Sequence, residues 1–162
     1  MCATRRSARS FLSRRKCLNA CLIASTFSCG HGFSLAAVPG VQLFSLQVGD
    51  GQEQLAALGG RFAVIDLGNR FDSTSFADAA AVVKNLDLVI AVDSAIVHLA
   101  GALGAPIWVA LALSPDWRWL LQRDDSPWYP TARLFRQTRL DDWGQVFQRM
   151  AGDLAKLISA MR

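Results

Sequence analysis

Apolar residues in this chain gather in short continuous runs, and the segments between the runs have the apolar spacing of helices. Residues 88–92 form one such run. Asp93 and Ser94 follow it, and a short apolar segment then reaches the turn Gly104-Ala105-Pro106 before a second run, residues 107–111. Continuous apolar strands separated by a helix are typical of a parallel sheet that is covered on both faces. Residues 88–111 therefore predict a strand, a polar turn, a short helix and a second strand.

The same alternation extends over residues 38–162. We expect further strands at residues 41–46 and 62–65, and the strand before Asp93 starts at residue 86. Helices are expected at residues 53–58, at 76–84 with Ser75 as the N-terminal cap, and at 143–161. The last helix carries an apolar stripe made of Val146, Phe147, Met150, Leu154, Leu157 and Ile158. The pattern predicts an α/β fold, a Rossmann-like parallel sheet with helices on both faces.

The charge is distributed unevenly along the 162 residues. The formal net charge is +4, but residues 1–49 hold six basic residues and no acidic one, whereas the rest holds eleven basic and thirteen acidic residues. The excess of positive charge therefore belongs to the N-terminal segment. For the domain itself we expect no nucleic-acid partner.

Residues 1–37 are rich in Cys, Ser and Arg and contain all four cysteines. We expect a basic, poorly ordered segment that lies outside a domain at residues 38–162. A targeting peptide is a second interpretation, because Ser13-Arg14-Arg15 precedes an apolar run as in a twin-arginine signal. That run is too short and too polar to span a membrane. A zinc site would have to use Cys17, Cys21, Cys29 and His31, which lack the close Cys-x2-Cys spacing of such sites.

The loops that follow the strands should meet at one edge of a parallel sheet. These loops are residues 47–51, 66–68, 93–95 and 112–118. Ser94 or Asp93 can cap the next helix, and the free N–H groups at its start can receive a phosphate. His98 lies on the same helical face, where its imidazole could donate to a diphosphate oxygen. The alternative is that Asp93 and Ser94 are only caps and that His98 is bonded to a backbone carbonyl.

Four aromatic residues, Trp117, Trp119, Trp128 and Tyr129, follow the last predicted strand. They could wall a base or a sugar, with Asp116 and Arg118 as polar contacts, or they could pack against the last helix. Trp108, inside a strand, is expected in the core. Asp124-Asp125 is expected to be a solvated pair, and we expect no metal site.

The segment Asp87–Pro106 resembles the nucleotide-sugar motif of glycosyltransferase family 9, the heptosyltransferases, in which Asp-Thr-(Gly/Ala)-x-x-His-x-x-x-Ala-x-Gly-x-Pro recurs. Ser94 replaces the commoner Thr and keeps its hydroxyl. Residues 115–119, 125–130 and 133–137 resemble heptosyltransferase-like domains of bacterial tetratricopeptide-repeat proteins. The similarity covers about residues 38–158.

The resemblance implies the C-terminal half of a GT-B fold, which consists of two facing Rossmann-like domains. It assigns donor binding to Asp93, Ser94, Ala95 and His98. It does not assign a catalytic role to any residue. It also implies metal-independent, inverting transfer without a cofactor, from a nucleoside-diphosphate sugar such as ADP-heptose. The acceptor would be a glycan, a lipid or a protein, and it would bind to the N-terminal domain. The resemblance also implies a role in lipopolysaccharide biosynthesis in the cytoplasm.

The chain departs from the family pattern in its first part. Family members start this domain with a strand and a Gly-Asn loop, which residues 1–37 do not resemble. An N-terminal domain with a carboxylate base is also missing, so we expect a truncated or disrupted member whose activity as an enzyme is uncertain. One alternative is a non-catalytic remnant. The other is a binding module that uses its basic tail on nucleic acid or anionic lipid, with Arg5, Arg6, Arg9, Arg14, Arg15 and Lys16.

Overall fold

The computed structural model describes residues 18–23, 32–47, 53, 55, 60–67, 72 and 75–161. Six parallel strands form one sheet in the order β3-β2-β1-β4-β5-β6. The strands are β1 (Leu18–Ile23), β2 (Val41–Ser45), β3 (Val64–Asp66), β4 (Leu88–Val92), β5 (Ile107–Leu111) and β6 (Ala132–Arg136). The predicted Rossmann-like parallel sheet is confirmed.

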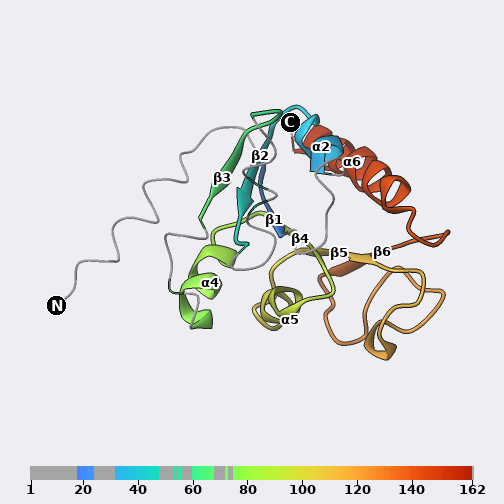
Figure 1. The fold of residues 1–162 in the computed structure, drawn as a ribbon. Helices are drawn as coiled ribbons and strands as arrows, with labels where there is room; N and C mark the ends of the chain where they lie inside the picture. Colours follow the sequence, from blue (N-terminus) through green and yellow to red (C-terminus); the bar gives the residue numbers. More distant parts are fainter. Residues whose placement is uncertain are drawn as a thin grey trace.

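Helices cover both faces of this sheet (Figure 1). They are α2 (Gly32–Ala36), α4 (Phe76–Val83), α5 (Ala95–Ala102) and α6 (Trp143–Ala160), and a short 3-10 helix η1 (Trp117–Trp119) lies in the loop after β5. Side chains of α2 and α6 form one hydrophobic core with one face, and those of α4 and α5 form a second core with the other. All residues of β4 and β5 are buried, which explains why these strands are continuous apolar runs.

Most of the predicted elements occur close to their expected limits. The strands at residues 41–46, 62–65, 86–92 and 107–111 correspond to β2, β3, β4 and β5. Ser75 caps α4 as predicted, because its hydroxyl accepts a hydrogen bond from the Ala77 N–H at 3.2 Å. In α6 the predicted stripe is buried except for Leu157, which is half-buried. Of the expected helix at residues 53–58, only residues 53 and 55 lie within the described part, and both are helical.

The prediction that residues 1–37 stand outside the domain is wrong for two elements, β1 and α2. Strand β1 lies in the middle of the sheet, where Leu18 pairs with Val41 of β2 and Ala20 pairs with Leu88 of β4. Helix α2 packs on α6 through the buried Leu35. The apolar run that forms β1 is flanked by a Ser- and Arg-rich composition, and this composition concealed the strand. Residues 1–17 and 24–31, including Ser13-Arg14-Arg15 and the basic side chains of the alternative binding module, lie outside the described residues.

Strand β6 is a third element that the hydrophobic pattern did not predict. Its sequence is Ala-Arg-Leu-Phe-Arg, in which Ala132, Leu134 and Phe135 are buried and Arg133 is exposed. Charged side chains of this kind are common on strands at the edge of a sheet. None of the helices within the described ranges has both the length and the hydropathy needed to cross a bilayer.

Candidate functional site

The strand order places the end of β4 at the switch point of the sheet. From β1 the chain proceeds outward through β2 and β3, and it then returns to β4 on the other side of β1. In open parallel sheets ligands bind outside the carboxyl ends of the strands at such a point. Asp93 and Ser94 directly follow β4, so the structure places the predicted pair at the switch point.

The backbone of Ser94 forms the N-terminal cap of α5, but the Ser94 side chain does not cap the helix. Its backbone is extended, and its carbonyl oxygen accepts a hydrogen bond from the Val97 N–H at 3.0 Å. Its hydroxyl makes no capping bond; Oγ is buried and has no hydrogen-bond partner among the described residues. The predicted side-chain cap is therefore wrong for Ser94. Since no side chain caps α5 within the described part, the N–H groups of Ala95 and Ile96 have no partner in the helix.

His98 lies one turn further along α5 and is partly exposed. Its Nδ1 lies 2.9 Å from the Tyr129 hydroxyl, so its partner is not the backbone carbonyl of the alternative interpretation. Its Nε2 lies 3.7 Å from Oδ1 of Asp93, which is longer than a hydrogen bond. The side chains of His98 and Asp93 are each 37% exposed. The structure therefore brings Asp93, Ser94, Ala95 and His98 together at the start of α5.

Two aromatic residues from the loop after β5 contact the imidazole of His98. The Trp119 ring stacks on it at 5.6 Å between centroids and 19° between planes, and the Tyr129 ring lies at 5.7 Å. Trp119 is fully buried, and both residues belong to the core on the α4 and α5 side. They therefore do not pack against α6. Trp117 and Trp128 are exposed, and Trp108 is a core residue against Phe135, as predicted.

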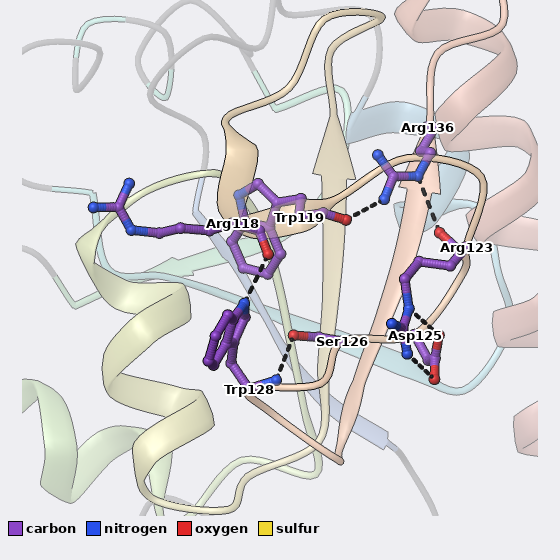
Figure 2. A network of polar contacts seen from close by, with 7 residues as sticks. All are labelled: Arg118, Trp119, Arg123, Asp125, Ser126, Trp128 and Arg136. Atoms are coloured by element: carbon purple, nitrogen blue, oxygen red, sulfur yellow. Dashed lines mark hydrogen bonds and ion pairs between the residues drawn. The ribbon is translucent and has the colours of Figure 1, made fainter.

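Arg136 holds the loop of residues 112–131 from β6 (Figure 2). Its guanidinium donates to the carbonyl oxygens of Trp119 at 2.6 Å and of Arg123 at 3.0 Å. Burial lowers the pKa of this guanidinium. Between the two carbonyls, Leu120 and Gln122 have positive φ angles of 55° and 57°. Arg136 thus fixes a strained turn beside the buried Trp119.

Two more contacts in Figure 2 stabilise the same loop. Arg123 binds Asp125 through two hydrogen bonds of 2.7 and 2.8 Å, and the Trp128 indole N–H donates to the carbonyl oxygen of Arg118 at 2.9 Å. The hydrogen-bonding pattern did not follow from the sequence, because the partners of Arg136 and Tyr129 lie 13 to 31 residues away.

The predicted polar contacts Asp116 and Arg118 pair with each other at the surface. The Arg118 guanidinium donates to Asp116 Oδ1 at 2.8 Å. The backbone N–H of Arg118 also donates to this carboxylate, and chiefly for that reason the pKa of Asp116 lies below its usual range. Among the residues that the structure describes, no three His, Cys, Asp or Glu side chains form a group that could hold a metal. Cys2, Cys17, Cys29 and His31 lie outside those residues, and of Cys21 only the backbone is described.

The other loops at this edge are described only in part. Gln47 after β2 is buried, and its N–H donates to the Ser45 hydroxyl at 3.2 Å. Asp66 at the end of β3 is exposed. Residues 48–51 and 68 lie outside the described part, so their predicted convergence with Asp93 stays a prediction.

A sequence match bears on this arrangement. Residues 62–111 match the sequence profile of glycosyltransferase family 9 (heptosyltransferase). The matched segment includes Asp93, Ser94, Ala95 and His98, but not Tyr129 or Arg136. This segment of the chain is related to glycosyltransferase family 9.

A curated protein is also similar in sequence to this chain. Protein FlbA of Caulobacter vibrioides is 34% identical over a match of 120 residues, and the match covers 70% of this chain and 19% of FlbA. The match is longer than the family 9 segment, so it includes residues outside that segment. The chain spans about a fifth of the length of this relative.

Three solved structures share the fold. A family 9 glycosyltransferase from Veillonella parvula has a TM-score of 0.66 at 14% identity, with 96% of this chain and 49% of that chain covered. The ADP-heptose LPS heptosyltransferase II of Escherichia coli has a TM-score of 0.62 at 16% identity, with 99% of this chain and 53% of that chain covered. The E. coli heptosyltransferase WaaC with ADP has a TM-score of 0.57 at 18% identity, with 96% of this chain and 48% of that chain covered. The chain thus corresponds to about half of each, and the predicted likeness to one half of a GT-B fold is confirmed.

Proposed function

We propose that this chain binds the nucleoside-diphosphate sugar donor of a family 9 transferase at the start of α5. The observation that carries the proposal is the buried Oγ of Ser94, which lacks a partner among the described residues and lies beside the uncapped N–H groups of Ala95 and Ile96. Buried hydroxyls are nearly always hydrogen-bonded, and the first N–H groups of a helix bind phosphate well. A diphosphate oxygen would satisfy both kinds of group.

The side chains around these groups are suited to different parts of the donor. Ser94 and the helix N–H groups suit the diphosphate, and an N–H of the His98 imidazole suits another of its oxygens. The carboxylate of Asp93 only accepts hydrogen bonds, so it suits sugar or ribose hydroxyls rather than phosphate. Backbone N–H groups would then stabilise the charge of the departing diphosphate, without a metal.

We propose ADP-heptose as the first donor to test, because two of the structural relatives are described with ADP-heptose or with ADP. The acceptor site and the general base would come from a second domain that faces the same edge of the sheet, as in a two-domain GT-B protein. A glycan or lipid acceptor in cytoplasmic lipopolysaccharide biosynthesis and an association with tetratricopeptide repeats are further parts of this proposal. No described residue is assigned a catalytic role.

Calorimetric titration with ADP, UDP and ADP-heptose tests donor binding. For Ser94→Ala we expect ADP affinity to fall by roughly tenfold to a hundredfold, because one hydrogen bond to an anion is lost. Thermal stability should stay unchanged or rise, because the substitution removes a buried hydroxyl without a protein partner. His98→Ala should also weaken binding while the fold is retained.

Ser159→Ala is the matched control, because Ser159 is exposed on α6, on the opposite face of the sheet. Its ADP affinity should equal that of the wild-type chain. The proposal is contradicted if the wild-type chain binds none of the three nucleotides, which would favour a non-catalytic remnant. It is also contradicted if Ser94→Ala and His98→Ala both bind ADP as tightly as the wild-type chain.

A further inference from the structure

The two nitrogens of the His98 imidazole face different chemical groups. Nε2 faces a carboxylate, Oδ1 of Asp93 at 3.7 Å, and Nδ1 lies 2.9 Å from the hydroxyl of Tyr129. A carboxylate can only accept, so it favours the tautomer with the proton on Nε2. In that neutral ring Nδ1 is an acceptor, and a tyrosine hydroxyl is a suitable donor for it.

We infer that Tyr129 is a positioning residue, whose hydroxyl donates to Nδ1 of His98 and thereby keeps the imidazole proton on Nε2, at the start of α5. What this N–H binds rests on the proposed function. The tautomer itself does not, because both of its determinants, Asp93 and Tyr129, belong to the chain.

A gap in the surface of α5 admits the tyrosine ring. Gly101 lies one turn beyond His98, and a Cβ at this position would lie 2.4 Å from Cδ1 and 2.5 Å from Cγ of Tyr129. Real Cβ atoms do not approach a ring so closely, so any side chain at position 101 would displace Tyr129. Glycine at this position therefore has a steric reason, in spite of its low helix propensity.

Trp119 and Tyr129 fix different properties of the imidazole. Trp119 stacks on the ring within 19° of parallel and so defines its plane. Tyr129 distinguishes one edge of the ring from the other, because a ring turned by half a rotation would present carbon rather than Nδ1 to the hydroxyl. Both residues come from the loop of residues 112–131, which Arg136 holds in place. This loop, rather than the helix that carries His98, thus sets the direction of the Nε2–H donor.

Nitrogen NMR of the imidazole tests the inference without a ligand. The chain contains two histidines, His31 and His98, so a His31→Gln variant assigns the signals. At about pH 8.5, above the ordinary titration range of imidazole, we expect His98 to have a protonated Nε2 and a hydrogen-bonded, unprotonated Nδ1. In Tyr129→Phe the Nδ1 resonance should shift toward that of a free imidazole nitrogen. A protonated Nδ1 in the wild-type chain, or an unchanged His98 spectrum in Tyr129→Phe, would overturn the inference.

A second variant separates the position of the ring from its hydroxyl. Gly101→Ala keeps the hydroxyl but displaces the ring, so it should change the His98 nitrogen spectrum in the same direction as Tyr129→Phe. Because alanine is the better helix former, weaker helix propensity cannot explain such a change. Gly152→Ala on α6 is the control, since an added Cβ there meets nothing within 4 Å. It should leave the His98 spectrum unchanged, and an unchanged spectrum in Gly101→Ala would count against the positioning role.

Titration with ADP then connects the tautomer to the proposed function. We expect Tyr129→Phe to bind ADP roughly fivefold more weakly than the wild-type chain, as for one lost or misdirected hydrogen bond. If the tautomer is the expected one but the wild-type chain binds no nucleotide, the positioning role stands and the proposed donor function fails. If Tyr129→Phe changes the nitrogen spectrum but binds ADP with unchanged affinity, the role of the tautomer in donor binding is refuted.

Discussion

At the scale of single residues, two serines in equivalent positions behave differently. Ser75 and Ser94 each precede an apolar helix, and each has an extended backbone. Ser75 is exposed and caps α4, whereas the Ser94 hydroxyl is buried and caps nothing. The sequence predicts a cap at both positions, because it contains no information on which hydroxyl the fold turns away from its own helix. Spacing alone predicted that Asp93, Ser94 and His98 are neighbours, but not what their side chains bind.

Trp119 offers a test of how the imidazole is supported. The residue is fully buried, and its Nε1 has no partner among the described residues. Trp119→Phe keeps a ring against His98 and removes the unpaired N–H, so we expect the free energy of unfolding to change by about 1 kcal/mol or less. Trp119→Ala should lower it by about 3–5 kcal/mol, because a large cavity is created. Urea denaturation measures both; equal losses for the two variants would contradict this view of the site.

At the scale of elements, the loop of residues 112–131 has little regular structure but is well supported. A single guanidinium from β6 binds the carbonyls on both sides of its strained turn, and an indole N–H and an ion pair hold its remaining parts. Contacts of this kind join residues that are distant in sequence. The periodicity of the chain therefore predicted the strands on either side of Asp93, but it did not predict the loop that encloses His98.

The strain in this loop leads to a prediction for Gln122. Its φ of 57° lies in the left-handed region, which costs a residue with a side chain roughly 1–2 kcal/mol. Gln122→Gly should relieve part of this cost and raise the free energy of unfolding by up to about 1 kcal/mol. Leu121→Gly is the matched control at a neighbouring position without a positive φ. It should lower stability by about 0.4–1 kcal/mol, because glycine adds freedom to the unfolded chain. The same sign of change in both variants, measured by thermal denaturation, would argue against strain at Gln122.

At the scale of the whole molecule, an ion pair connects α6 to the edge of the sheet, and a second pair within α6 shares its carboxylate. Arg133 of β6 binds Asp153 of α6 at 2.5 Å, and Lys156 binds the other oxygen of this carboxylate at 2.8 Å. The hydrogen bond from Lys156 is the main reason why the pKa of Asp153 lies below its usual value, and Arg133 adds to the effect. The charged carboxylate therefore stabilises the folded chain.

This lowered pKa predicts a stability difference that depends on pH. Because the folded value lies below the unfolded one, the contribution of Asp153 is fully present above about pH 5 and is lost as the pH falls through the folded value. Asp153→Asn should therefore melt at a lower temperature than the wild-type chain at neutral pH. The two melting curves should converge on acidification below about pH 4. Asp141→Asn controls for the loss of one negative charge, because Asp141 is exposed and its positive φ of 58° suits Asp and Asn alike. A difference between Asp153→Asn and the wild-type chain that does not change with pH would contradict this prediction.

The fold could be predicted where burial alone decides an element. Strands β4 and β5 are buried on both faces and α6 is buried along one stripe, so a continuous run and a helical period identified them. Strands β1 and β6 were missed for different reasons. The run of β1 is surrounded by Ser and Arg, and β6 contains arginines because it lies at the edge. Composition over a wide window therefore misjudged the centre of the sheet, whereas local periodicity identified the other strands apart from the edge strand β6.

The contact between Gly101 and Tyr129 makes two positions that are 28 residues apart in the sequence sterically dependent on each other. A side chain at position 101 is admitted only if residue 129 becomes smaller, but a smaller residue leaves the imidazole nitrogen without its hydroxyl partner. The effects of substitutions at the two positions on the His98 site should therefore be non-additive. A change to a different pair by single substitutions would pass through a chain in which the ring is displaced or Nδ1 of His98 lacks its hydroxyl partner. The helix that carries His98 is thus not free to diverge independently of the loop that covers it.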